Sequence, residues 1–186
     1  GGQFAARLWW MARWIGLTNV ALLNGGITKW IADGRPLATE VPTAQPAALR
    51  GHADALKTWN AAEVLAHVAD EQIALIDARP AERYRGEVEP IDPVAGRIPS
   101  AANRFYKANL NADLTFRAPD DIRNEFAALT NNKPADSVVH YCGSGVTACA
   151  NIFAMEYAGL TGSKLFAGSW SEWVSDPTRP VTKEGK

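Results

Sequence analysis

Three short apolar runs in this chain lack the polar alternation of a strand with one face in water. They lie at residues 73–76, 138–141 and 164–167. Runs of this kind are typical of strands that are covered on both faces, as in parallel sheets. Helical patterns separate them, and strands that alternate with helices favour a parallel sheet with helices on both faces. The sequence therefore predicts an α/β fold built on an open parallel sheet.

The predicted helices carry recognisable start signals. Asn60 followed by Glu63 is a capping-box pattern, so a helix is expected to begin directly after Asn60. Pro119 fits the first turn of a helix that runs to about residue 129. A further helix is expected over 146–157, and Ser169 is expected to cap a last short helix.

Residues 1–36 give a separate pattern of helix, strand and helix, with the strand expected at 20–23 and the second helix at 27–32. This segment holds four tryptophans: Trp9, Trp10, Trp14 and Trp30. One strand cannot form a sheet, so we expect the segment to be the end of an upstream domain whose rings lie against the rest of the chain or a partner. Residues 37–58 are predicted to be a linker with room for one edge strand, and residues 59–186 a complete domain.

Composition argues against several classes of function. The 19 basic and 20 acidic residues give a net charge of −1, without the basic stripe of a nucleic-acid partner. No apolar run approaches the roughly 20 residues of a membrane span. Two cysteines make no disulfide framework, so a cytoplasmic location is expected, although the chain starts with Gly and an upstream targeting segment stays open. Zinc-site spacing is absent, and neither a metal nor a cofactor is expected.

The turn after the run 138–141 carries the chemistry. Cys142 follows that run at once, and the loop behind it consists of Gly143, Ser144, Gly145, Val146 and Thr147. The glycines let backbone N–H groups turn inward, and the next helix adds the positive end of its dipole. Such surroundings lower the pKa of a thiol and suit a persulfide or another anion. The alternative is that Cys142 is a small side chain packed at a strand end, as free cysteines often are.

This loop, 142–148, resembles the active-site loop of the rhodanese superfamily, and most closely the branch that contains 3-mercaptopyruvate sulfurtransferases. Other motifs resemble that family too, at residues 77–79, 83–86, 96–101 and 168–173. Arg97 stands where the family usually has His, and Ser100 where it usually has Gly. Residues 5–30 resemble the end of the non-catalytic N-terminal domain of two-domain sulfurtransferases, so the resemblance makes residues 59–186 the catalytic domain.

The resemblance implies sulfur transfer in two steps. The Cys142 thiolate would take the outer sulfur of an anionic donor and become a persulfide, and a thiol or cyanide would then remove that sulfur. The donor would be 3-mercaptopyruvate or, as an alternative, thiosulfate, and thioredoxin is a candidate acceptor. A second alternative is a rhodanese-like binding or regulatory module without activity, although such modules usually lack the cysteine.

The resemblance also assigns roles to other residues. Arg83 is the candidate for binding the negative end of the donor, because a guanidinium can hold two oxygens, and Arg97 is a second candidate. Asp77, Arg79 and Trp170 are expected to support the site, with Asp77 pairing with an arginine and Trp170 at the pocket wall or in the core. Ser144 and Thr147 can donate hydroxyl groups to the sulfur or to the leaving group, or they can serve only the structure of the loop and the cap of the next helix.

Two competing chemistries are excluded by single positions in the same loop. A cysteine-dependent phosphatase needs an arginine where Ala148 stands, and a thioredoxin-type redox pair needs a cysteine where Gly145 stands. His140 lies inside a predicted buried strand and is expected to be a core residue rather than a base. Cys149 falls within the predicted helix and is expected to be packed there.

Overall fold

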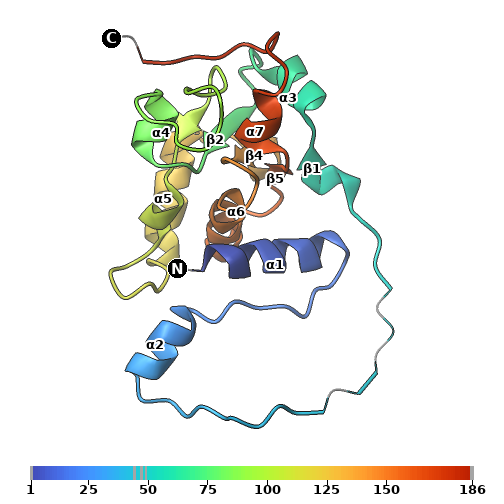
Figure 1. Cartoon of the computed structure of the whole chain (residues 1–186), viewed down its shortest axis with the longest axis vertical. Coiled ribbons are helices and arrows are strands. Elements are labelled where there is room, and N and C mark those ends of the chain that lie inside the picture. The colour runs from blue at the N-terminus through green and yellow to red at the C-terminus, as the bar shows by residue number, and fades with distance from the viewer. Residues whose placement is uncertain (1, 44, 47, 49, 185–186) are drawn as a thin grey trace.

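A computed structural model describes residues 2–43, 45–46, 48 and 50–184 of the chain. Its centre is a sheet of five parallel strands in the order β1, β5, β4, β2, β3 (Figure 1). The strands are β1 (Thr58–Trp59), β2 (Ala74–Asp77), β3 (Ala102–Asn103), β4 (Val138–Tyr141) and β5 (Lys164–Phe166). The expected open parallel sheet is therefore confirmed, with β1 and β3 as short edge strands.

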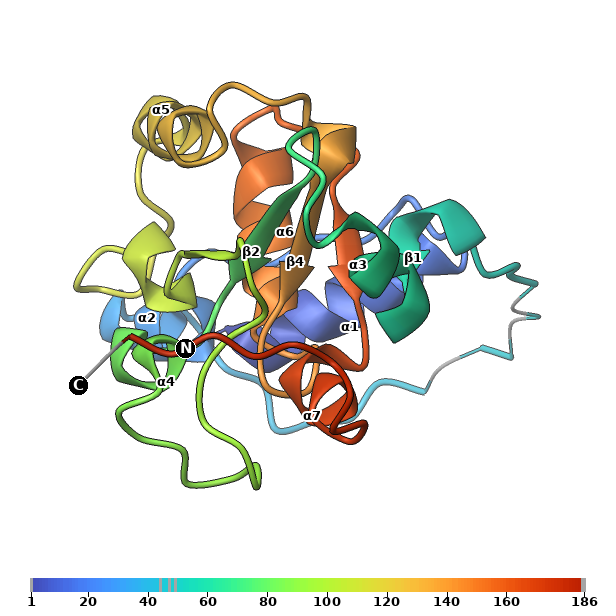
Figure 2. The ribbon, with the colours of Figure 1, turned by 90° about the horizontal axis from the view of Figure 1, so that it is seen from above.

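Helices cover both faces of the sheet, as expected (Figure 2). On one face, Leu75, Val139 and Tyr141 pack against α3 (Ala61–His67) and α7 (Ser169–Trp173). On the other face, Ile76 and Val138 pack against α5 (Pro119–Leu129) and α6 (Ala148–Tyr157). All four residues of β4 are buried, which is why that segment of the sequence shows no polar alternation; its one strongly polar residue, His140, is buried too.

Two of the helix starts that the sequence predicts are confirmed, those of α3 and α5. The Asn60 side chain accepts hydrogen bonds from the N–H groups of Ala62 and Glu63, and the Glu63 side chain accepts one from the Asn60 N–H. Pro119 is the first residue of α5. A short helix, α4 (Ala81–Arg85), follows β2, and three single 3₁₀ turns occupy Ala55–Lys57, Tyr106–Asn109 and Ala135–Ser137. Among the described residues, no helix combines the length and apolarity that a membrane crossing requires.

The N-terminal segment forms two helices, α1 (Gln3–Trp14) and α2 (Gly26–Ala32). Trp9 and Trp10 of α1 are buried in a cluster with residues of α6, and the Trp9 ring meets the Phe153 ring edge-on at 4.9 Å. The expectation that these two rings lie against the rest of the chain is confirmed. Trp30 of α2 is only half-buried, and its Nε1–H donates to the Pro36 carbonyl.

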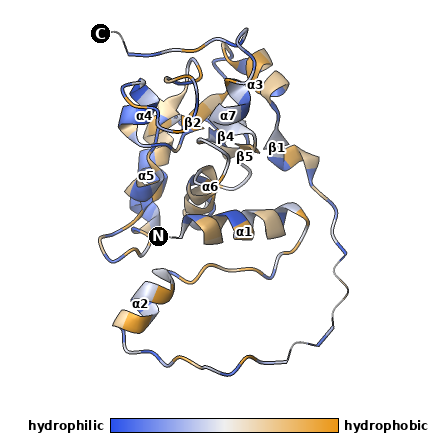
Figure 3. Cartoon of the chain, viewed as in Figure 1, coloured by the Kyte–Doolittle hydropathy of each residue, from blue (hydrophilic) through white to orange (hydrophobic). Residues whose placement is uncertain are grey.

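Apolar side chains remain exposed on both N-terminal helices, and Figure 3 shows apolar residues in orange along α1 and α2. They are Phe4, Leu8 and Met11 on α1, and Ile27 and Ile31 on α2. The interpretation of residues 1–36 as the end of an upstream domain remains a prediction.

The strand predicted at 20–23 is wrong, because these residues have no strand assignment. The prediction rested on the apolar run 20–23 and the turn residues at 24–26. The structure directs attention to a sequence repeat here: Gly16, Leu22, Gly25 and Trp30 recur with equal spacing as Gly159, Leu165, Gly168 and Trp173. In the second copy Leu165 lies in β5, between β1 and β4. In the first copy the described residues place no strand beside 20–23, and a strand without a neighbour leaves its backbone groups unpaired.

His140 of β4 is a core residue, in agreement with the sequence-based expectation. Its Nε2 lies 3.1 Å from the Met155 sulfur, and Nδ1 has no partner among the described residues. Burial lowers the pKa of His140 from 6.5 to about 3. The imidazole is therefore neutral in the folded protein at neutral pH.

Acid should destabilise the protein through His140. Between pH 6.5 and about 3 the unfolded chain binds a proton at His140 and the folded chain does not, so stability falls as pH falls. The slope from this one group is about 1.4 kcal/mol per pH unit. Urea unfolding at several pH values should give a shallower acid slope for His140→Phe than for the wild type, and equal slopes would contradict this account.

Candidate active site

The carboxyl ends of β2 and β4 meet at one edge of the sheet. Asp77 and Tyr141, the last residues of these strands, are register partners, so Ala78 and Cys142 leave the sheet side by side. A cavity of about 220 Å³ opens at this edge. It is lined by Arg79, Pro80, Arg83, Ile91, Tyr106, Cys142, Gly143, Ser144, Val146, Thr147 and Ser171. Ligands in open α/β sheets bind at this edge, so the cavity is the candidate active site.

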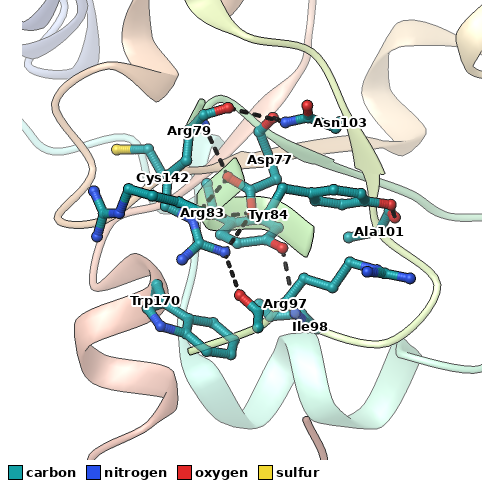
Figure 4. A network of polar contacts seen from close by, with 12 residues as sticks. Asp77, Arg79, Arg83, Tyr84, Arg97, Ile98, Ala101, Asn103, Cys142 and Trp170 are labelled. Atoms are coloured by element: carbon teal, nitrogen blue, oxygen red, sulfur yellow. Dashed lines mark hydrogen bonds and ion pairs between the residues drawn. The ribbon is translucent and has the colours of Figure 1, made fainter. Parts of the chain in front are cut away.

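Cys142 lies at the base of the loop and is held by the start of α7. Only 2% of Cys142 is exposed. Its backbone N–H donates to the Ser169 hydroxyl at 3.1 Å, and its carbonyl accepts from the Trp170 N–H at 3.0 Å. Figure 4 shows its sulfur on the side of the polar network where the Arg83 guanidinium lies.

Ser169 does not cap α7, so that expectation is wrong. It is the first residue of the helix with φ at 55°, and the N-cap position falls on Gly168. The Ser169 hydroxyl donates to the Phe166 carbonyl and accepts from the Cys142 N–H. The Ser169 hydroxyl thus links the end of β5 to the loop that begins at Cys142.

Gly145 is required by the geometry of the loop. Its φ is 75°, and a Cβ atom there would overlap the carbonyl oxygen of Ala167. The Gly145 carbonyl accepts hydrogen bonds from Arg7 Nη1 at 3.2 Å and from the Cys149 thiol at 3.3 Å. Helix α1 therefore contributes directly to the shape of the loop.

The loop offers unpaired donors. The backbone N–H groups of 143–147 have no hydrogen-bond partner among the described residues. Helix α6 begins at Ala148, two residues later than the sequence pattern predicts, and no side chain caps its start. The loop donors and the positive end of the α6 dipole can therefore stabilise an anion beside Cys142.

Asp77 and Arg79 form a buried ion pair beneath the cavity. Arg79 Nη2 lies 2.6 Å from Asp77 Oδ2, and both side chains are almost fully buried. The guanidinium lies 4.7 Å above the Trp170 ring, and Nη2 also donates to the Gly96 carbonyl. Trp170 is buried in the core and its Nε1–H donates to the Val94 carbonyl. These contacts support the loop that precedes Arg97.

Arg83 of α4 reaches the cavity. Its Nε and Nη2 donate to Glu89, and Nη2 also lies 3.4 Å from Asp92. The guanidinium is next to the reactive loop, since a Cβ atom on Gly143 would lie 3.6 Å from Nη1. Ser171 completes this wall, because its hydroxyl contacts Asp92 and the Gly143 carbonyl.

Arg97 lies elsewhere. Its guanidinium stacks 4.5 Å from the centre of the Tyr84 ring, its backbone pairs with Thr182, and it does not line the cavity. Figure 4 shows Arg97 and Cys142 on opposite sides of the Asp77–Arg79 pair.

The second cysteine, Cys149, is not placed to act as a nucleophile. Cys149 is fully buried in α6, and burial raises the pKa of its thiol to about 12, although Arg7 lies beside the sulfur. It is a packed side chain, as its position in the predicted helix suggested.

Several residues at the site were not predicted from the sequence. They are Arg7, Glu89, Asp92, Tyr106 and Ser171. Glu89 and Asp92 look like ordinary loop acids in the sequence. Ser171 lies within the motif at 168–173, and that motif was the one signal that could have identified it.

A protein-family model described as the rhodanese-like domain matches residues 60–176. A "Probable 3-mercaptopyruvate sulfurtransferase" of Pseudomonas aeruginosa is 46% identical over 97% of this chain and 64% of its own length. A "Thiosulfate sulfurtransferase" of Cricetulus griseus is 32% identical over 100% of this chain and 64% of its own length. The chain thus spans less than two thirds of the length of these relatives.

Among solved structures, an anaerobic ergothioneine biosynthesis enzyme from Chlorobium limicola has a similar fold. The TM-score is 0.86 at 24% identity, over 98% of this chain and 45% of that enzyme. At this identity the likeness concerns the fold alone.

Proposed function

The chain belongs to the rhodanese-like domain family, and on that basis we propose that it transfers a sulfane sulfur from 3-mercaptopyruvate to a thiol or cyanide through a persulfide on Cys142. The observation that carries this proposal is the position of Cys142. It lines a cavity at the carboxyl edge of a parallel sheet, in a loop with unpaired N–H groups. Residues 59–186 hold Cys142 and the other residues that line this cavity, and we assign the activity to them.

The reaction balances without a cofactor. The Cys142 thiolate attacks the donor sulfur, a sulfur–sulfur bond forms, and the carbon–sulfur bond of 3-mercaptopyruvate breaks. The electron pair leaves as the enolate of pyruvate, which takes up a proton. An acceptor thiolate then attacks the outer sulfur of the persulfide, forms its own persulfide and releases the Cys142 thiolate, whereas cyanide would leave as thiocyanate.

The loop can stabilise the anions of both steps. The N–H groups of 143–147 follow Cys142 directly and have no partner among the described residues, which supports a role in holding a persulfide anion, and the hydroxyls of Ser144 and Thr147 are further donors. Arg83 supplies the positive charge for the carboxylate of the donor. Gly143 and Ser144 add no charge beside the sulfur, which favours a donor whose negative group lies away from the transferred atom.

Thiosulfate is the second candidate donor, by the same mechanism. The Cricetulus griseus relative, a thiosulfate sulfurtransferase by name, favours it. Ile91 of the cavity wall favours it too, because it stands where mercaptopyruvate enzymes commonly carry a second arginine for the donor. Steady-state kcat/KM for both donors, measured on the full-length natural protein, decides between them. A clear preference for thiosulfate would overturn the donor assignment, and absence of sulfur uptake from either donor would favour a binding module.

Arg83→Ala should weaken donor use. Loss of a charge-assisted hydrogen bond costs roughly 1.5–3 kcal/mol, which corresponds to a decrease of about tenfold to a hundredfold in kcat/KM. Arg85→Ala is the matched control, because Arg85 lies on the same helix but pairs with the exposed Glu87. An unchanged KM for both donors in Arg83→Ala would remove the role given to this arginine.

A further inference from the structure

Glu89 is the carboxylate that binds both arginines in the wall of the candidate active site, Arg79 and Arg83. Only 4% of its side chain is exposed. It accepts hydrogen bonds from Arg79 Nη1 at 3.2 Å and from Arg83 Nε and Nη2 at 3.2 Å and 2.5 Å. The backbone N–H groups of Ile91 and Asp92 also donate to it. Burial alone would raise the pKa of Glu89, but the hydrogen bonds hold it below its usual value, so the group is ionised at neutral pH.

These contacts leave Arg83 with one free nitrogen. Glu89 occupies Nε and shares Nη2 with Asp92, whereas Nη1 has no partner among the described residues. Nη1 and Nη2 lie 3.6 Å and 3.7 Å from the place where a Gly143 side chain would begin, so Nη1 is a nitrogen that is both next to the loop and unpaired among the described residues. Asp92 is itself fixed by the Ser171 hydroxyl at 2.7 Å. The guanidinium is therefore held with one edge toward the carboxylates and one nitrogen toward the reactive loop.

Two interpretations of this arrangement predict opposite effects of Glu89 removal on donor binding. If Glu89 and Asp92 only neutralise Arg83, they compete with the donor anion, and removal of one charge should strengthen donor binding. If Glu89 instead fixes the orientation of Arg83, its loss should weaken binding, because the arginine side chain has several rotatable bonds and can leave the cavity wall. The five hydrogen bonds on one buried carboxylate favour the second interpretation.

We propose that Glu89 is a positioning residue that fixes Arg83 so that Nη1 alone contacts the donor. This inference rests on the proposed function, since it assumes that an anionic donor occupies the cavity. Its consequence is that the donor carboxylate is held by a single guanidinium nitrogen together with N–H groups of the loop, and not by a two-nitrogen fork. Binding of the donor, rather than the attack by Cys142, is the step that Glu89 controls.

The test compares Glu89→Gln with Glu87→Gln in the full-length natural protein. Glu87 is the matched control, because it lies in the same segment but is exposed and pairs with Arg85. The KM of Glu89→Gln for the better donor should rise about tenfold, as expected for one weakened charge-assisted contact, while kcat and the amount of persulfide at saturating donor stay near the wild-type values. Glu87→Gln should match the wild type.

The double variant Arg83→Ala/Glu89→Gln provides the readout that a purely structural role would not give. If Glu89 acts through Arg83, the KM of the double variant should equal that of Arg83→Ala. Independent, multiplying effects would overturn the proposal, and so would a lowered or unchanged KM in Glu89→Gln. If Glu89→Gln fails to fold, Asp92→Asn replaces it, with a smaller rise in KM expected and a lowered or unchanged KM again decisive against positioning.

Failure of the proposed function and failure of the positioning role give different experimental results. If the wild-type protein gains no sulfur from either donor, the proposed function is wrong, and the positioning role of Glu89 is wrong with it. If the wild type and Glu89→Gln turn over the donor with equal KM, sulfur transfer stands and only the positioning role of Glu89 is lost.

Discussion

Cys142→Ser is expected to lose sulfur transfer completely while the fold stays intact. The serine hydroxyl is not ionised at neutral pH and its oxygen cannot carry the transferred sulfur as a persulfide, so neither step can proceed. The residue is small, and its backbone contacts with Ser169 and Trp170 do not involve the sulfur. Mass spectrometry after donor treatment should show a gain of one sulfur atom in the wild type and none in the variant.

Cys149→Ser is the control for this experiment. Its sulfur lies against the Gly145 carbonyl, and a hydroxyl can donate to the same oxygen. The buried thiol has a pKa of about 12 and does not supply a thiolate at neutral pH. Turnover should therefore be largely retained. Sulfur transfer by Cys142→Ser, or persulfide on Cys149 in the wild type, would refute the assignment of Cys142.

The sequence predicted those elements whose signals lie within a few residues. Asn60 and Glu63 satisfy each other locally, and Pro119 fixes its own φ, so these helix starts appear where the sequence places them. Strand β4 was equally predictable, because a strand buried on both faces lacks the regular polar alternation of a strand with one face in water. Because the carboxyl ends of parallel strands meet at one edge of a sheet, Cys142 and Arg79, which follow the runs 138–141 and 73–76, can be expected to lie close together from the sequence pattern.

The remaining features depend on partners that are distant in the sequence. Residues 20–23 have the composition of a strand, but pairing requires a neighbour. Strand β3 has two residues, too few for a pattern. Ser169 looked like a helix cap, yet its hydroxyl bonds Cys142, which is remote in the sequence. Glu89 differs, since its partners Arg79 and Arg83 are only ten and six residues away, but it lies in a loop without a periodic pattern that could indicate these side-chain contacts.

Asp77→Asn should cause the largest loss of stability among the variants considered. Asp77 and Arg79 are 0% and 1% exposed, and the carboxylate accepts from Arg79 Nε, Nη2 and the Arg79 backbone N–H. An amide retains one oxygen and turns an N–H₂ group toward the guanidinium, so two donors face each other. Breaking a buried pair on one side costs about 3–5 kcal/mol in free energy of unfolding.

That loss is a large share of the roughly 5–15 kcal/mol by which a domain is stable. Urea unfolding should show a lower midpoint for Asp77→Asn, with Glu87→Gln close to the wild type because its ion pair is exposed. The damage should also reach the active site, since Arg79 donates to Glu89 and Glu89 holds Arg83. At a temperature where Asp77→Asn is still folded, its KM for the donor should therefore rise. A loss of less than about 1 kcal/mol would place Asp77–Arg79 among pairs that contribute little, as exposed ones do, and would contradict the view that Arg79 supports Arg83 through Glu89.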